Sequence, residues 1–421
     1  MKTPIFTAKA PSTEQGPALL TVQQARTQII DAINPLATQD RVAIRDALQR
    51  ILAETIHSPI NVPPYTNSAM DGYALRSSDL PTTGTTQLKL IGTSWAGRPF
   101  SGTVGTQECV RIMTGAKMPA AADTVVMQEQ VQTSNDGIVI GSGHQCGQHV
   151  RHAGEDIPQG SCVLNAGKKI GPAELGLLAS LGISHVKVTR RVRVAFFSTG
   201  DELRSVGEPL AEGQIYDSNR YTLFGMLQQA GVEFIDMGVV RDQPEAIEQA
   251  LLEAAKNAEV ILTTGGVSVG DADFVKDALD KLGKINFWRI AMKPGKPLAV
   301  GKINNAYFFG LPGNPVSVMS TFYQFVLPAL RKMAGQSNIS PLLVRAMSKS
   351  NIKKSPGRTD FQRGILSYQN GTLQVDATGM QASHILSGMS RANCFIVLEQ
   401  NAGDIEAGSE VEVQPFVDFW S

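Results

Sequence analysis

Three glycine-containing segments in the second half of the chain combine residue types that bind phosphates and metal ions. They are STGDEL at 198–203, GGVSVGDAD at 265–273 and LPGNPV at 311–316. Paired glycines let a backbone approach a phosphate and direct several N–H groups toward it. A single turn of this kind is more often only a tight connection between a strand and a helix, but three in one chain favour a binding site.

Asp271 and Asp273 follow the paired glycines and would repel a bare phosphate. A cation must then neutralise them, and Mg²⁺ suits this position because it takes one or two carboxylates and bridges to phosphates. The structural alternative is a turn whose acidic side chains stabilise the N-terminus of the following helix through its dipole.

Basic residues are concentrated in the sequence that follows Asp273. Residues 281–302 contain six lysines and arginines and no acid, whereas residues 233–280 contain eleven acids and three bases. Lys293 and Lys296 lie in the segment MKPGKP (292–297), whose prolines restrict the loop. These two lysines are candidate contacts for an anion, although exposed loop lysines are the simpler interpretation.

Two upstream segments, NSAMDGYA at 67–74 and RIMTGA at 111–116, are predicted from local chemistry to be turns at strand ends. His144, Cys146, His149 and His152 lie close together in the sequence, but their spacing fits no familiar zinc pattern. We expect this cluster to be structural or exposed.

The composition is that of an ordinary globular protein of two to four domains, with 421 residues and 42% hydrophobic content. The 38 basic residues balance 38 acidic ones, which argues against a nucleic-acid binder. The sequence shows no secretory signal and no apolar run long enough for a membrane span. Four scattered cysteines indicate no disulfide framework, so we expect a cytoplasmic protein.

Predicted strands and helices alternate along residues 191–335, and these elements must position the residues described above. Continuous apolar runs predict strands buried on both faces, and helical periodicity separates them. The predicted strands are 192–197, 232–240, 260–264, 297–300 and 306–310, and the predicted helices are 219–230, 244–255, 274–282 and 314–332. This alternation predicts an α/β domain with a doubly wound, mostly parallel sheet.

The rest of the chain has a different character. Residues 21–56 have helical periodicity, residues 58–146 have short strands, and residues 172–181 have one short helix, while strands return after residue 335. We therefore predict a multidomain α/β protein. The changes in pattern indicate a discontinuous helical and mixed linking domain (1–57 and 147–190), an inserted β domain (58–146), the α/β domain (191–335) and a C-terminal β domain (336–421), which is a small barrel or a sandwich.

Together with IYDSN at 215–219, the motifs above resemble those of the MoeA-type molybdopterin molybdenumtransferases, the family that includes the gephyrin E domain. The resemblance implies an elongated homodimer with this four-part subunit, in which the C-terminal domain (336–421) is a β-barrel. It also implies insertion of molybdate into the dithiolene of adenylyl-molybdopterin, with Mg²⁺-dependent release of AMP.

The resemblance also assigns roles to individual positions. The implied catalytic residues are Asp71, Thr114, Glu202, Asp242, Asp273, Lys293 and Lys296. The implied residues for binding the pterin substrate are Ser198, Thr199, Gly200, Gly265, Gly266, Ser268, Pro312, Gly313, Asn314, Pro315 and Ser383. The implied metal ligands are Asp242, Asp271 and Asp273. Asp71 and Thr114 would come from the partner subunit, and Arg289 stands where the family suggests a lysine, so its role stays open.

Two alternatives remain at this stage. The first is that this chain is a molybdopterin adenylyltransferase, an activity that would need only the α/β domain. A separate adenylyltransferase is also a possible partner of this chain. A non-catalytic scaffold of the gephyrin E-domain type would retain the fold without the chemistry. The additional domains favour the transferase over the first alternative, and the acidic site residues favour it over the second.

Overall fold

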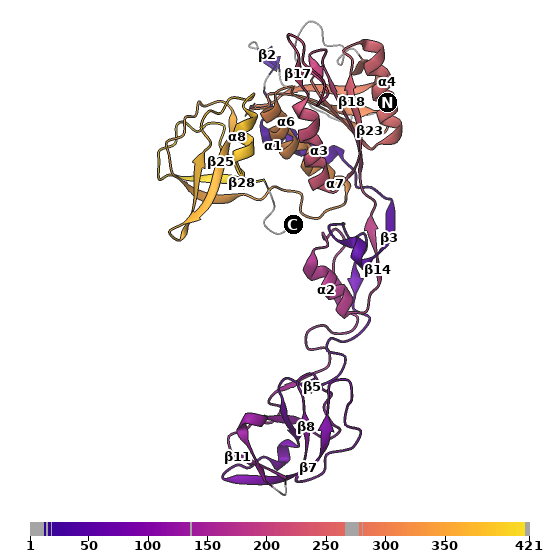
Figure 1. Cartoon of the computed structure of the whole chain (residues 1–421), viewed down its shortest axis with the longest axis vertical. Helices are drawn as coiled ribbons and strands as arrows, with labels where there is room; N and C mark the ends of the chain where they lie inside the picture. Colours follow the sequence, from indigo (N-terminus) through magenta and orange to yellow (C-terminus); the bar gives the residue numbers. More distant parts are fainter. Residues whose placement is uncertain are drawn as a thin grey trace.

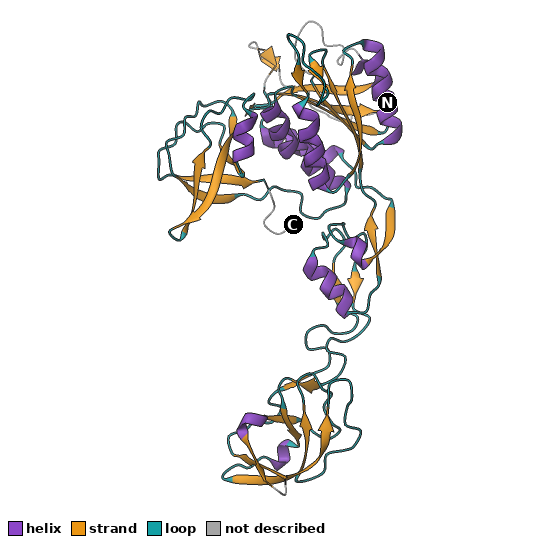
Figure 2. Ribbon diagram, in the orientation of Figure 1, coloured by secondary structure: helices purple, strands orange, loops and turns teal. Residues whose placement is uncertain are grey.

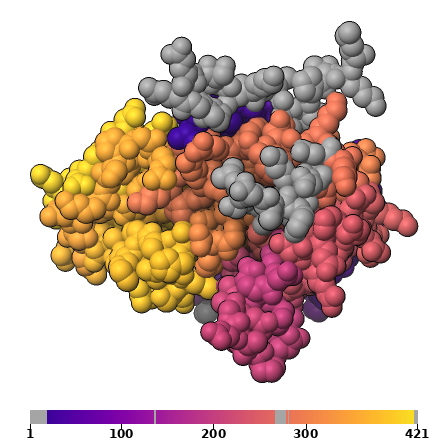
Figure 3. Space-filling model, turned by 90° about the horizontal axis from the view of Figure 1, so that it is seen from above, coloured from indigo at the N-terminus to yellow at the C-terminus, as the bar shows by residue number. Residues whose placement is uncertain are grey.

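The computed structural model describes residues 12–13, 16–17, 19–134, 137–265, 278–279 and 281–416. Within these residues, no helix is long and apolar enough to cross a membrane. The chain is elongated: the α/β sheet and the C-terminal barrel form one broad end, and a β-rich unit forms the other (Figures 1 and 2). Seen from above, the broad end shows the barrel beside the α/β part (Figure 3).

The α/β part contains a six-stranded sheet in the order β18-β15-β19-β23-β22-β20. Its first four strands are parallel, whereas β22 is antiparallel to both of its neighbours. The strands are β15 (Arg193–Thr199), β18 (Glu233–Val240), β19 (Val260–Thr264), β20 (Gly283–Arg289), β22 (Pro297–Ile303) and β23 (Ala306–Leu311). The predicted doubly wound, mostly parallel sheet is confirmed, with an antiparallel edge.

Both faces of this sheet are covered, as the apolar strands require. Phe196 of β15 lies in one core with helices α3, α6 and α7, and its neighbour Phe197 lies in the other core with α4. The helices are α3 (Ser218–Ala230), α4 (Pro244–Asn257), α6 (Pro315–Thr321) and α7 (Leu327–Met333), with a π-helical turn at Phe322–Val326 between the last two. Helix α3 ends at Gly231, whose φ of 69° is left-handed.

Helix α1 (Val22–Ala32) begins at Thr21, which forms a capping box with Gln24. Its buried residues Ala25 and Ile29 belong to the α/β core, and Arg26 donates to Gln324 of the π-helical turn. This packing differs from the sequence-based grouping of the helix with the linking residues, because helical periodicity does not indicate which core a helix covers.

The linking unit is built from two separated stretches of chain. Strand β3 (Gln39–Ala43) pairs with β14 (His185–Thr189), and β4 (Ile56–His57) pairs with β13 (Cys162–Leu164). Helix α2 (Pro172–Ser180) covers their shared core. The helical structure predicted for residues 21–56 is confirmed only for α1. Farther along, a strand (β3) and a short 3₁₀ turn (Ile44–Ala47) form instead, because β3 pairs with a strand distant in sequence.

The inserted β unit contains a six-stranded sheet in the order β10-β11-β7-β8-β6-β9. Its strands are β6 (Gly72–Leu75), β7 (Thr85–Ser94), β8 (Glu108–Ile112), β9 (Thr124–Met127), β10 (Val131–Ser134) and β11 (Gly137–Gly141). At the junction with the linking unit, β5 (Asn67–Ser68) pairs with β12 (Val150–Arg151). Tyr73 and Leu88 lie in the core of this unit.

The C-terminal unit is a closed five-stranded barrel in the order β25-β26-β24-β28-β27, with β27 pairing back to β25. The strands are β24 (Val344–Ser348), β25 (Thr359–Gln369), β26 (Thr372–Ala377), β27 (Cys394–Leu398) and β28 (Glu410–Pro415), with helix α8 at Leu386–Arg391. The predicted barrel is confirmed. Strand β21 (Met292–Lys293) of the α/β part joins β25 in parallel and ties the barrel to the α/β sheet.

Candidate functional site

The carboxyl ends of three neighbouring parallel strands meet at one edge of the α/β sheet. After β19, Gly265 has φ of 87°, and a Cβ at this position would lie 2.6 Å from the Thr199 carbonyl oxygen at the end of β15. A Cβ on Gly313, after β23, would approach the Gly265 Cα to 4.0 Å. The Ser198 and Thr264 hydroxyls hydrogen bond at 2.9 Å between buried strands. Ser198 and Thr264 therefore fix the strand ends, and the glycines keep the space above them open.

A cavity of about 590 Å³ lies at this edge, between the α/β sheet and the barrel. The predicted residues that line it are Gly265, Lys293, Lys296, Pro312, Gly313, Asn314 and Ser383. The fold therefore brings together three motifs and one position in the barrel that are distant in sequence. Pro315 does not line the cavity but occupies the first turn of α6, where its missing N–H is tolerated.

The barrel contributes lining residues that the sequence analysis missed, namely Arg358, Gln381 and His384. They come from two connections in the barrel, one before β25 and one between β26 and α8, which carry no recognisable binding motif. The available signal was Gly357, whose φ of 105° permits a turn directly before Arg358.

The cavity is electrostatically suited to an anion. Lys293, Lys296 and Arg358 line it, and the described lining contains no aspartate or glutamate. The Ser383 carbonyl accepts a hydrogen bond of 3.1 Å from the Val316 N–H, which joins the barrel wall to α6. Arg289 is exposed on β20 and is not part of the described lining.

Carboxylates gather at the ends of β15 and β18, beside the glycine turn. A Cβ on Gly200 would lie 2.5 Å from a Glu202 carboxylate oxygen, so the Glu202 side chain folds back over this glycine. Burial raises the pKa of Asp242, and the charges of Asp201 and Glu202 raise it further. A bound cation would relieve this repulsion, which is the feature of the structure that fits Mg²⁺.

The other predicted acidic and glycine-turn residues, Asp271, Asp273, Gly266 and Ser268, lie outside the described residues. Among the residues that the structure does describe, no three His, Cys, Asp or Glu side chains are grouped closely enough to hold one metal ion. In the histidine segment, His144 hydrogen bonds instead to the Gln148 amide at 2.9 Å.

Asp71 and Thr114 lie together at the ends of paired strands in the β unit. One Asp71 carboxylate oxygen accepts hydrogen bonds of 2.7 Å from both the backbone N–H and the hydroxyl of Thr114. These two donors lower the pKa of Asp71. Within one chain, however, this pair lies at the opposite end of the molecule from the α/β sheet (Figure 1).

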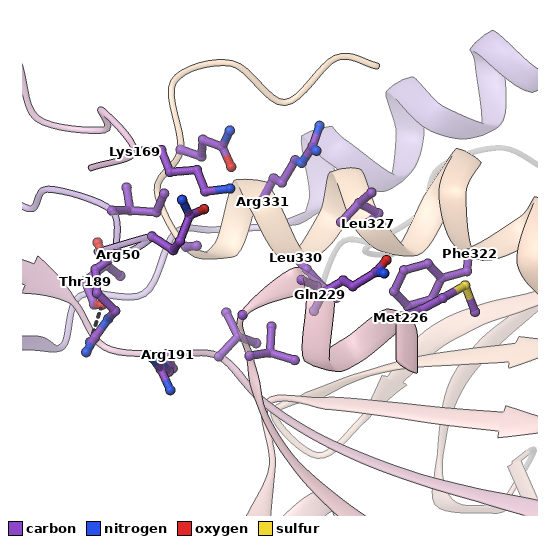
Figure 4. Close-up of a pocket in the computed structure, with 18 of the residues that line it drawn as sticks. Arg50, Lys169, Thr189, Arg191, Met226, Gln229, Phe322, Leu327, Leu330 and Arg331 are labelled. Atoms are coloured by element: carbon purple, nitrogen blue, oxygen red, sulfur yellow. Dashed lines mark hydrogen bonds between the residues drawn. The ribbon is translucent and has the colours of Figure 1, made fainter. Parts of the chain in front are cut away.

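A second cavity, of about 270 Å³, lies where the linking unit meets the α/β part (Figure 4). Arg50, Lys169, Arg191 and Arg331 line it, together with apolar side chains such as Leu330. None of the residues predicted to act in binding or catalysis lies in its described lining. The first cavity is therefore the candidate site.

The fold and the first cavity define a multidomain α/β protein in which a β-barrel closes a cation-lined cavity at the edge of the sheet. Three family models match consecutive parts of the chain: the MoeA N-terminal region (domains I and II) at residues 20–182, a probable molybdopterin binding domain at 195–332, and the MoeA C-terminal region (domain IV) at 345–416. The chain belongs to the molybdopterin molybdenumtransferase family, whose members are enzymes of molybdenum cofactor biosynthesis.

Individual relatives support this assignment over nearly the whole chain. The chain is 47% identical to the molybdopterin molybdenumtransferase of Haemophilus influenzae, with 94% of this chain and 99% of that protein covered. It is 36% identical to gephyrin of Dictyostelium discoideum, with 89% of this chain and 59% of that protein covered. A crystal structure of a MoeA protein from Pyrococcus horikoshii is 29% identical, with a TM-score of 0.84, and covers 95% of this chain and 100% of its own.

Proposed function

We propose that this chain inserts molybdenum from molybdate into the dithiolene of adenylylated molybdopterin, with release of AMP. The observation that carries the proposal is the cation-lined cavity, in which Lys293, Lys296 and Arg358 surround a space beside the glycine turn. Its volume is within the range of small-molecule sites and exceeds the need of an oxyanion alone. Family membership supports the choice of substrates.

The side chains divide into two groups by charge. The two lysines and Arg358 attract molybdate, and the open backbone at Gly265 and Gly313 admits the phosphates of the pterin substrate. Asp242 and Glu202 provide carboxylates for Mg²⁺, together with the predicted ligands Asp271 and Asp273. When bound, Mg²⁺ neutralises the charge of the phosphates. The protein then contributes positioning and charge stabilisation.

We further propose a cytoplasmic homodimer in which Asp71 and Thr114 of one subunit complete the cavity of the other. Apolar side chains on the α/β part support a protein interface: Tyr221 and Phe224 of α3 and Ile235 of the edge strand β18 are between 42% and 49% exposed. An edge strand beside exposed apolar side chains favours association. A molybdopterin adenylyltransferase that supplies the substrate is a further proposed partner.

The decisive assay supplies the purified protein with adenylylated molybdopterin, molybdate and MgCl₂ and measures AMP release together with protein-bound molybdenum. We expect Lys296→Gln to raise the half-saturating molybdate concentration about tenfold or more, since it removes a charge-assisted contact. Lys302→Gln is the matched control, because Lys302 lies over the Tyr307 ring and outside the described lining of the cavity.

A second reaction tests the alternative, that the chain is a molybdopterin adenylyltransferase. The protein is incubated with ATP and molybdopterin that has not been adenylylated, and the formation of adenylylated product is followed. Rapid adenylylation would show that the chain acts one step earlier, and would overturn the proposal.

A further inference from the structure

Arg363 of β25 is a cation enclosed in the barrel, and no described aspartate or glutamate forms an ion pair with it. It is 1% exposed and is among the largest fully buried side chains of the described chain. Among the described residues, its guanidinium contacts carbonyl oxygens rather than a carboxylate, and burial lowers its pKa. Its Nε atom is buried and has no hydrogen-bond partner in the part of the chain that the structure describes. Because isolated buried charges are costly, barrel stability alone gives a poor explanation for an arginine here.

The hydrogen bonds of the Arg363 guanidinium join it to one short segment of the barrel, residues 378–382, and its backbone bonds to the same segment. The guanidinium donates to the Met380 carbonyl at 2.6 Å and to the Ala382 carbonyl at 3.2 Å. Its backbone N–H donates to the Gln381 side chain at 2.8 Å, and its carbonyl accepts from the Thr378 N–H at 3.0 Å. The side chain and backbone of one residue thus hold four residues of this connection in place: Thr378, Met380, Gln381 and Ala382.

This connection continues to residue 384, and residues 381–384 form the barrel wall of the cavity that contains Lys293 and Lys296. Gln381, Ala382, Ser383 and His384 all line that cavity, whereas Arg363 does not. The segment is also bonded to the opposite wall, through the Val316 N–H and the Ser383 carbonyl. Two adjacent residues, Ala382 and Ser383, are therefore held from opposite sides, by Arg363 inside the barrel and by Val316 of α6.

We propose that Arg363 is a positioning residue for the anion site, which holds segment 378–384 in the shape that molybdate binding requires. The inference rests on the proposed function of the cavity. Arg363 acts through the segment and does not touch the substrate. Loss of its two carbonyl contacts would release the wall that carries Ser383 and His384, and would weaken molybdate binding more than the chemical step.

Gly388 of α8 provides a way to displace the guanidinium without deleting it. A Cβ on Gly388 would lie 2.9 Å from the Arg363 Nε and 3.5 Å from its Cδ. Alanine is otherwise favoured over glycine in a helix. Gly388→Ala should therefore keep the barrel folded while it shifts the arginine away from the two carbonyl groups.

The test measures the half-saturating molybdate concentration and kcat of the full-length protein for Arg363→Met, Arg363→Lys and Gly388→Ala, with thermal unfolding of each variant. Arg363→Met should raise the half-saturating concentration about tenfold with kcat within about twofold, since loss of both charged hydrogen bonds acts on binding. Arg363→Lys, which can reach one carbonyl, should recover part of this loss, and Gly388→Ala should show a smaller increase. Arg26→Met is the matched control, because Arg26 also donates to a carbonyl, that of Gln324, away from the described cavity lining.

Lys296→Gln, measured in parallel, separates the two proposals. If Lys296→Gln raises the half-saturating concentration and folded Arg363→Met and Gly388→Ala do not, the positioning role of Arg363 is wrong and the anion site stands. If Lys296→Gln has no effect, the proposed function of the cavity fails. An equal increase in Arg26→Met would show a general loss of domain packing and would also overturn the role of Arg363.

Discussion

Two aspartates proposed to act in one reaction have opposite electrostatic surroundings. Thr114 donates twice to Asp71 and lowers its pKa, so this carboxylate is held ready as a charged acceptor. Burial and the nearby Asp201 and Glu202 raise the pKa of Asp242. The charged form of Asp242 is therefore disfavoured in the folded protein, whereas the charged form of Asp71 is favoured.

We predict that Asp242→Asn stabilises the protein in the absence of divalent metal. A carboxyl group whose pKa is raised by folding stabilises the folded state at low pH, and this contribution is lost as the pH rises through the folded pKa. At neutral pH the charged Asp242 is thus unfavourable, and its removal should add up to about 1 kcal/mol. The gain should shrink as the pH falls toward the ordinary carboxyl range, which denaturant unfolding at several pH values would measure.

In the presence of MgCl₂ we expect the wild type to be more stable than Asp242→Asn, because the wild type gains a cation contact that the variant lacks. Asp156→Asn, an exposed position near the β unit, provides the control. Equal stabilisation of the wild type and Asp242→Asn by Mg²⁺ would contradict the proposed role of Asp242 as a ligand.

Thr114→Val tests whether the hydrogen bond from the Thr114 hydroxyl keeps Asp71 ionised for the reaction. The valine keeps the backbone donor but removes the hydroxyl donor, so the pKa of Asp71 should move back toward its ordinary range. If ionised Asp71 is needed, the acidic limb of the pH–activity profile should shift to higher pH. A Thr114→Ser variant, which restores the hydroxyl, should retain the wild-type profile, and an unshifted profile in Thr114→Val would refute the idea.

At the scale of elements, apolar runs and capping residues predicted most of the α/β sheet. Strand β19 was predicted at its observed bounds, because a run buried on both faces leaves little choice of structure. The prediction failed where distant pairing decides, since β3 forms against β14 despite helical periodicity. The antiparallel direction of β22 has a local cause, its short connection to β23.

In the candidate site, too, some residues were found from local sequence patterns and others were missed because distant parts of the chain bring them together. Motif residues such as Lys296 and Gly313 were found because their spacing is distinctive, and the structure places both in one cavity. Arg358 and Gln381 were missed, because only the closure of the barrel against the α/β sheet brings them there. Sequence patterns report local geometry, and a wall supplied by another domain has no local pattern.

The turn after β19 gives a prediction at this scale. Gly265→Ala would place a Cβ 2.6 Å from the Thr199 carbonyl at a left-handed backbone position. We expect it to lower the free energy of unfolding by about 2 kcal/mol or more and to impair substrate binding. Gly313→Ala is the matched control, since its nearest neighbour would be the Gly265 Cα at 4.0 Å. Equal stability of the two variants in urea would show that the close approach of these strand ends is not needed.

At the scale of the whole molecule, the proposed reaction requires groups that one chain keeps apart. The α/β cavity lies beside the barrel, whereas Asp71 and Thr114 lie in the β unit at the other end, beyond the linking unit (Figure 1). The linking unit contains two short strand pairs and one helix, and connects the two ends without bringing them together. A homodimer with one β unit against each α/β cavity would resolve this separation.

This arrangement predicts complementation between two inactive variants. Asp71→Asn should inactivate the site to which its β unit contributes, and Lys296→Gln should weaken the cavity of its own chain. In a mixed dimer of the two, one site then carries both substitutions and the other carries neither. Purified mixed dimers, isolated with two affinity tags, should therefore recover about half of the wild-type activity at low molybdate, where each parent variant is nearly inactive. Mixed dimers no more active than the parents would place each complete site within one chain, and a purified protein that is monomeric at assay concentration would exclude the shared site altogether.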